Sequence, residues 1–126
     1  MIVAGIGARG GATAQEIAEA VRDACGRAGL EVSEVGIVCG MQRAAVTEAA
    51  SELSVQAKLC TLDELRAEAE RCVTHSERSM AATGVPSVAE AAAMAAAGPD
   101  GMMFLPRVAY ANVTVALAIA PGATAP

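Results

Sequence analysis

The chain has 126 residues, a length that corresponds to one domain with a core of its own. Hydrophobic residues make up 54% and charged residues 18%, which excludes a disordered chain, and no apolar run reaches the roughly 18 residues of a membrane span. The net charge of −5, with 1 Phe, 1 Tyr and no Trp, argues against nucleic-acid binding. Because no basic leader precedes the first apolar residues, we expect a cytoplasmic protein that contacts neither nucleic acid nor membrane.

The first half of the chain predicts strands that alternate with helices. Ile2–Ile6 and Val35–Cys39 are β-branched runs beside glycines, which is typical of buried strands. Between them, Thr13–Glu16 has the pattern of a capping box, and apolar residues at helical spacing follow it as far as Gly29. A second helix, near Gln42–Leu53, continues the alternation.

The second half of the chain repeats this pattern. Val55–Leu59 predicts a strand, and Thr61–Glu64 is a second capping box that opens a helix to about Arg71. Ser87–Glu90 is a third capping box, and it opens an alanine-rich helix that Gly98 ends. Two further strands are predicted over Met102–Leu105 and Val113–Ile119.

Two stretches have no regular pattern. The polar segment Val73–Val85 predicts an ordered surface loop, and Pro121–Pro126 predicts a frayed tail. Alternating strands and helices favour parallel pairing, because parallel strands need crossover connections that helices provide. The sequence therefore predicts an α/β fold, one domain over residues 1–120, with a mostly parallel sheet covered by helices on both faces. The last strand is the one that could pair antiparallel.

The cysteines and the single histidine do not form a metal-binding pattern. The cysteines have no C-x-x-C spacing, and His75 has no second histidine to accompany it. We therefore expect no metal site and no cofactor. A cysteine inside a predicted strand packs as a small hydrophobic residue, so buried thiols are favoured over disulfides. The residues concerned are Cys25, Cys39, Cys60 and Cys72.

A glycine-rich turn follows the first predicted strand. Gly5–Gly10 matches G-x-G-x-x-G, a turn whose backbone N–H groups and following helix can face an anion. A dinucleotide site would also need an acidic residue at the end of the second strand, where this chain has Gly40–Arg43. A dinucleotide is therefore disfavoured, and an anion cradle competes with a purely structural turn. The cradle would consist of Gly7, Gly10, Gly11 and Thr13.

Four blocks of sequence resemble one known family. Gly5–Thr13 is similar to the opening motif of the CobE/CbiG C-terminal family of cobalamin biosynthesis. Three further blocks agree with that family in the same order, and together the four extend over nearly the whole chain. The resemblance implies a compact three-layer αβα domain. The three further blocks are Thr74–Arg78, Thr83–Ala93 and Asn112–Ala116.

The resemblance also implies a role. For CobE-like proteins it implies binding or carrying a polycarboxylate precorrin or hydrogenobyrinate-type intermediate. CbiG is a longer protein that opens a precorrin δ-lactone with loss of a two-carbon aldehyde. A lactone hydrolase of this type, with Ser76 or His75 beside the glycine turn, is therefore one alternative. A non-catalytic partner of another pathway enzyme is the other, and no catalytic residue is assigned.

The arginines could supply the charge that such a ligand needs. An acidic protein repels a polycarboxylate unless it gathers its arginines in one place. In an open parallel sheet that place is the carboxyl edge, where Arg9, Arg43 and Arg107 follow predicted strands. Arg78, in the polar loop, could join them. The predicted ligand-binding residues are Gly7, Arg9, Gly10, Gly11, Thr13, Arg43, Ser76, Arg78 and Arg107.

Overall fold

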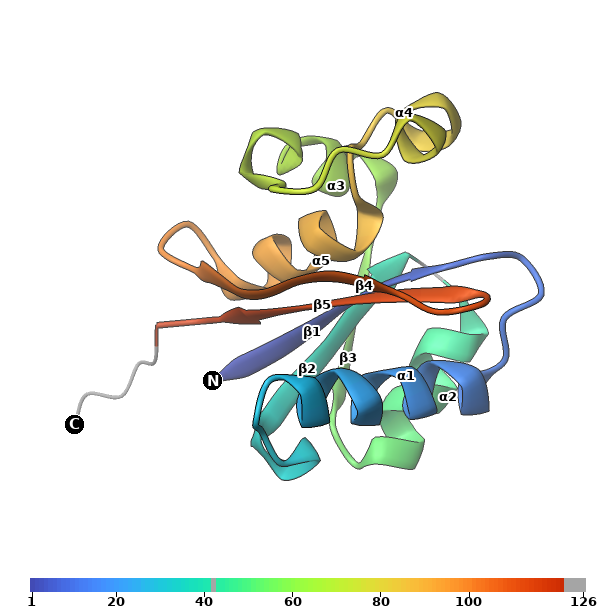
Figure 1. Ribbon diagram of the computed structural model, residues 1–126, viewed down its shortest axis with the longest axis vertical. Helices are drawn as coiled ribbons and strands as arrows, with labels where there is room; N and C mark the ends of the chain where they lie inside the picture. Colours follow the sequence, from blue (N-terminus) through green and yellow to red (C-terminus); the bar gives the residue numbers. More distant parts are fainter. Residues whose placement is uncertain (42, 122–126) are drawn as a thin grey trace.

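The fold is built on a five-stranded sheet with the strand order β3-β2-β1-β5-β4 (Figure 1). The computed structural model describes residues 1–41 and 43–121. β1 pairs in parallel with β2, and β2 in parallel with β3, whereas β5 runs antiparallel to both β1 and β4. The prediction of a mostly parallel sheet with an antiparallel last strand is confirmed. The strands are β1 (Ile2–Ala8), β2 (Val35–Met41), β3 (Gln56–Cys60), β4 (Met102–Ala109) and β5 (Val113–Ile119).

Helices cover both faces of the sheet, so the domain has the expected three layers (Figure 1). On one face, α1 (Ala14–Arg27) and α2 (Ala44–Leu53) share a core with β1, β2 and β5. On the other face lies α5 (Val88–Ala97), with α3 (Leu62–Arg66) and α4 (Glu77–Thr83) beyond it. None of the helices in the described residues is long and apolar enough to cross a membrane.

The alanine-rich helix α5 lies unusually close to β1. A Cβ atom at Gly5 would overlap the backbone of Ala89 and Ala93 in α5. Because both helix residues are also small and fully buried, the two backbones meet without large side chains between them. The first glycine of the G-x-G-x-x-G pattern therefore serves the packing of α5.

The polar segment Val73–Val85 is not only a loop, because it contains α4. Ser76 caps this helix by accepting a hydrogen bond from the Ser79 N–H at 3.2 Å, and Gly84 ends it with a φ of 76°. No residue of α4 is buried. A helix without a buried face leaves no apolar periodicity, and for this reason the sequence pattern missed it.

Two other predicted boundaries are wrong. The helix predicted to extend to Arg71 ends at Arg66, and a 3₁₀ turn over Ala69–Arg71 follows it. The Arg71 side chain instead donates to the carbonyl oxygen of Gly98 at 2.8 Å, at the end of α5. β4 continues to Ala109, which places Arg107 within the strand rather than after it.

Three further predictions concern the cysteines, the start of the second helix and the C-terminal tail. All four cysteines are free thiols, and all but the half-buried Cys72 are buried, as predicted. The predicted start of the second helix at Gln42 lies outside the described residues, which resume with Arg43 before α2. Of the predicted tail Pro121–Pro126, only Pro121 lies within the described residues.

Candidate functional site

A cavity of about 440 Å³ lies at the carboxyl edge of the parallel strands. Its lining comes from the ends of β1 and β2, from α4, from the start of α5 and from the β4–β5 hairpin. Part of the wall is apolar and part carries arginines, as in sites that hold amphipathic small molecules. The apolar part includes Ile6, Met41, Val46, Ala82, Val88 and Val113.

Half of the arginines of the chain line this cavity. They are Arg9, Arg43, Arg78 and Arg107. Within residues 1–41 and 43–121, none of these side chains has a carboxylate oxygen within 4.0 Å, and the cavity lining contains no Asp or Glu. The other arginines pair with acids elsewhere, in the pairs Arg22–Glu52, Arg27–Asp23, Arg66–Asp63 and Arg71–Glu68. The cavity is therefore a locally cationic site in an acidic chain.

Arg9 and Arg43 come from the loops after β1 and β2. The Arg43 guanidinium donates to the backbone carbonyl oxygen of Arg9 at 2.8 Å. The Arg9 N–H in turn donates to the carbonyl oxygen of Asn112 in the β4–β5 turn, at 3.0 Å. Backbone anchoring of this kind positions the Arg9 side chain without occupying its guanidinium group.

Ser76 and Arg78 reach the cavity on α4. The Ser76 N–H donates to the carbonyl oxygen of Pro86 at 3.0 Å, which ties the start of α4 to the segment before α5. The Ser76 hydroxyl oxygen is the helix cap described above. Arg78 is exposed, and the cavity therefore reaches the molecular surface at this side.

The glycine turn contributes less to the cavity than the sequence predicted. Gly7 lines it, but Gly10, Gly11 and Thr13 do not. The Thr13 hydroxyl accepts from the Glu16 N–H at 3.1 Å, and Glu16 accepts from the Thr13 N–H at 2.9 Å and from the Asn112 amide at 2.8 Å. These bonds, first of all the one from Asn112, lower the pKa of the Glu16 carboxyl. The carboxylate of Glu16 thus already lies at the N-terminus of α1, where the sequence predicted an anion of a ligand.

The structure does not assemble a nucleophile and base around Ser76. His75 is exposed and does not line the cavity. Within the part of the chain that the structure describes, no histidine or carboxylate forms a hydrogen bond with the Ser76 hydroxyl. Nucleophilic catalysis by serine needs such a base within hydrogen-bond reach. The geometry therefore assigns no catalytic residue.

Sequence reasoning missed a buried acid next to the cavity. Ser87 caps α5 by accepting from the Glu90 N–H at 3.2 Å, but the Glu90 carboxylate does not return to Ser87 as a capping box requires. It accepts instead from Val73, Thr74 and the backbone of Arg107. The signal available in the sequence was a single glutamate in an alanine-rich helix. Its position three residues after Ser87 led to its interpretation as a capping-box acid.

Sequence reasoning also missed Tyr110, which lines the cavity at the end of β4. Its hydroxyl donates to the Asp23 carboxylate at 2.6 Å, and the Arg27 guanidinium lies 5.9 Å from the ring centre. Burial and then the bond to Asp23 raise the pKa of Tyr110 to about 12. These contacts fix the β4–β5 hairpin against α1.

Comparison with known proteins gives a consistent set of relatives. Residues 2–118 match the family model described as cobalamin synthesis G C-terminus. The protein CobE of Sinorhizobium sp is 30% identical over 121 residues, which represent 93% of this chain and 79% of that protein.

Solved structures agree with this match. A crystal structure of CobE, described as a protein from the cobalamin (vitamin B12) biosynthetic pathway, has the same fold, with a TM-score of 0.86 at 24% identity over 94% of this chain and 89% of that chain. The cobalamin biosynthesis protein chiG of Agrobacterium tumefaciens str. C58 has a TM-score of 0.74 at 36% identity, over 97% of this chain and 100% of that chain. A cobalamin biosynthesis protein G homolog of Sulfolobus solfataricus has a TM-score of 0.80 at 26% identity, over 95% of this chain but only 37% of that chain.

Proposed function

The chain belongs to the cobalamin synthesis G C-terminus family, and from this membership we propose that it binds a polycarboxylate corrin precursor in the arginine-lined cavity. Its place in cobalamin biosynthesis follows from the family and from the CobE relative. The bound intermediate is the proposed part. A precorrin or hydrogenobyrinate-type molecule combines a largely apolar ring with carboxylate side chains.

The observation that carries the proposal is the sorting of the arginines. Four arginines line the cavity with no carboxylate oxygen within 4.0 Å of their guanidinium groups, whereas the other four pair with acids elsewhere on the described chain. Gathering like charges costs free energy unless an anion compensates them. Arginine also forms bidentate hydrogen bonds with carboxylates, and for this reason it suits a ligand with several such groups.

The apolar part of the cavity supports the same class of ligand. Ile6, Val46 and Val113 contribute buried side chains to the lining, so one wall can contact a ring face while the arginines meet its carboxylates. The volume of about 440 Å³ is within the range of small-molecule sites, whose cavities measure roughly 300–1,000 Å³.

The test is a titration with hydrogenobyrinic acid, followed by the absorbance of the ligand and by calorimetry. We expect saturable binding that weakens as salt is added, because ionic strength screens the attraction between arginines and carboxylates. Arg78→Ala is the site variant. Arg22→Ala is the matched control, because it removes the same charge from an arginine of α1 that pairs with Glu52 of α2 and does not line the cavity.

Four outcomes separate the candidate roles. Loss of affinity in Arg78→Ala but not in Arg22→Ala supports the proposal. An equal loss in both variants indicates a charge effect without a site and contradicts it. Release of an aldehyde from a lactone-bearing precorrin would point to the hydrolase instead, and co-purification with a pathway enzyme without ligand affinity would point to a docking partner.

A further inference from the structure

Glu90 is a fully buried acid in a helix made mostly of alanine. Its exposed fraction is 0%, and it lies between Ala89 and Ala91, both of which are also fully buried. A carboxylate removed from water in this way is costly unless hydrogen bonds replace its hydration. No arginine or lysine in residues 1–41 and 43–121 forms an ion pair with it. Its retention in the core therefore depends on neutral donors.

Four donors satisfy this carboxylate, and they come from two separate segments. Oε1 accepts from the backbone N–H groups of Val73 and Thr74, both at 2.8 Å. Oε2 accepts from the Thr74 hydroxyl at 2.6 Å and from the backbone N–H of Arg107 at 2.9 Å. Glu90 thus joins α5 to the segment that leads into α4 and to β4.

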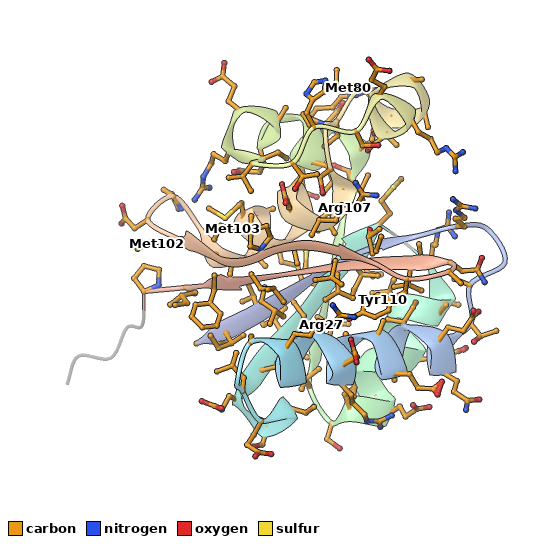
Figure 2. The ribbon with its side chains drawn as sticks, in the orientation of Figure 1. Arg27, Met80, Met102, Met103, Arg107 and Tyr110 are labelled. Carbon is orange, nitrogen blue, oxygen red and sulfur yellow. The ribbon has the colours of Figure 1, made fainter. Side chains whose placement is uncertain are left out.

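The bond to Arg107 lies at an irregularity of β4. The pairing of β4 with β5 shifts register between Leu105 and Val108, and Pro106 within this interval has no N–H to donate. A bulge of this kind redirects the side chain that it contains. Figure 2 shows Arg107 on the α5 side of β4, and its side chain lines the cavity.

We propose that Glu90 is a positioning residue for ligand binding, which holds the backbone of Arg107 in the β4 bulge so that the Arg107 guanidinium faces the cavity. This inference rests on the proposed function, because it assigns Arg107 to the binding of a carboxylate. Glu90 itself does not contact the ligand, since it is fully buried and does not line the cavity.

The hydrogen-bond pattern supplies a selective variant. In Glu90→Gln the amide oxygen can keep both backbone donors of Val73 and Thr74. The amide nitrogen then replaces Oε2. The Thr74 hydroxyl can rotate and accept from it, but the Arg107 N–H is a donor that cannot. The substitution therefore releases Arg107 and keeps the other contacts.

Thr74→Val is the matched control, because it removes the hydroxyl that donates to Oε2 but leaves the hydrogen bond from Arg107 in place.

Hydrogen exchange measured by NMR on the protein without ligand gives the first readout. We expect the Arg107 amide to exchange faster in Glu90→Gln while those of Val73 and Thr74 stay protected, and the Arg107 amide to keep its protection in Thr74→Val. An unchanged Arg107 amide in Glu90→Gln overturns the inference, whatever the protein binds.

The second readout is a double-mutant cycle with hydrogenobyrinic acid. We expect Glu90→Gln to weaken binding about tenfold in the parent and in Arg78→Ala, but to have no further effect in Arg107→Ala. A general structural role predicts the same loss in every background, and that result counts against positioning. If Glu90→Gln does not fold, Glu90→Asp replaces it in both readouts, with a smaller loss of affinity that again vanishes in Arg107→Ala.

The two readouts keep this inference and the proposed function apart. If the parent protein binds no hydrogenobyrinic acid, the proposed function fails, and Glu90 loses its role in ligand binding with it. If the parent binds but Glu90→Gln binds equally well, only the positioning role fails.

Discussion

The Arg43 guanidinium donates to the backbone carbonyl oxygen of Arg9 at 2.8 Å, across 34 positions of the chain. The two residues follow neighbouring parallel strands, so the bond joins two loops at the edge where the cavity lies. It commits part of the Arg43 side chain to the scaffold. The Arg9 side chain takes no part in it and is available to a ligand, and the two arginines therefore differ in what their removal should change.

Arg9→Ala should weaken the binding of hydrogenobyrinic acid by about 10- to 100-fold, because a charge-assisted hydrogen bond contributes about 1.5–3 kcal/mol. Its free energy of unfolding should stay within about 0.5 kcal/mol of the parent, since the backbone bonds of Arg9 remain. Calorimetric titration and urea unfolding measure the two quantities. Unchanged affinity would remove Arg9 from the site.

Arg43→Ala should lower both affinity and stability. It removes a cavity charge and also the bond that joins the loops after β1 and β2, which is worth about 1 kcal/mol. The same titration and urea unfolding apply. A variant that loses affinity with no loss of stability would show that the bond to Arg9 does not hold these loops together.

Thr13→Ala should destabilise the fold and leave affinity alone. The Thr13 hydroxyl accepts from the Glu16 N–H at 3.1 Å as the cap of α1 and does not line the cavity. Loss of such a cap costs about 1 kcal/mol in the free energy of unfolding. A change in affinity of more than about threefold, which is roughly 0.7 kcal/mol, would instead place the N-terminus of α1 in the binding site.

Gly5→Ala and Gly10→Ala should differ sharply, although both glycines belong to the same motif. A Cβ atom at Gly5 overlaps the backbone of Ala89 and Ala93, so α5 must move, at a cost of about 1–3 kcal/mol or more. A Cβ atom at Gly10 meets nothing within 4 Å. Thermal unfolding should show a large decrease in Tm for the first variant and almost none for the second. Similar decreases in the two variants would contradict the close packing of α5 on β1.

Tyr110 should make stability fall in alkaline solution. Its pKa in the folded protein, about 12, lies above the value of 10.0 for an unperturbed tyrosine, because burial and the bond to Asp23 favour the protonated hydroxyl. The stabilisation is therefore complete below pH 10 and is lost as the pH rises towards 12. Tyr110→Phe should be less stable than the parent at pH 8, and urea unfolding should show the difference shrinking between pH 10 and 12. If the difference in stability stays constant over this interval, ionisation of the Tyr110 hydroxyl is not what lowers the stability of the parent.

Local patterns in the sequence predicted the alternation of strands and helices and singled out the last strand as the one that could pair antiparallel. Period and composition are local signals, and the buried strands Ile2–Ala8 and Val35–Met41 show them strongly. The same locality explains the misses. α4 buries no residue, so it has no apolar periodicity that could distinguish a helix from a loop. Its cap at Ser76 was visible only as one more polar residue.

The place of the arginines was partly predictable. The rule that ligands bind at the carboxyl edge of a parallel sheet pointed to Arg9, Arg43 and Arg107, and the structure places all three in one cavity with Arg78. Three of the remaining arginines pair with acids only three or four positions away in the chain, a spacing that the sequence shows. The pair Arg22–Glu52 was not predictable, because these residues lie on different helices and meet only through the packing of α1 on α2.

The partners of buried polar groups were decided by the tertiary structure alone. Glu90 has the sequence position of a capping-box acid, yet its carboxylate turns to Thr74 and to the backbone of Arg107, 17 residues away. A buried carboxylate takes whichever donors the fold brings within about 3 Å. Local spacing tells which bonds a residue can form with its neighbours in the chain, but only the assembled layers decide whether a more distant donor replaces them.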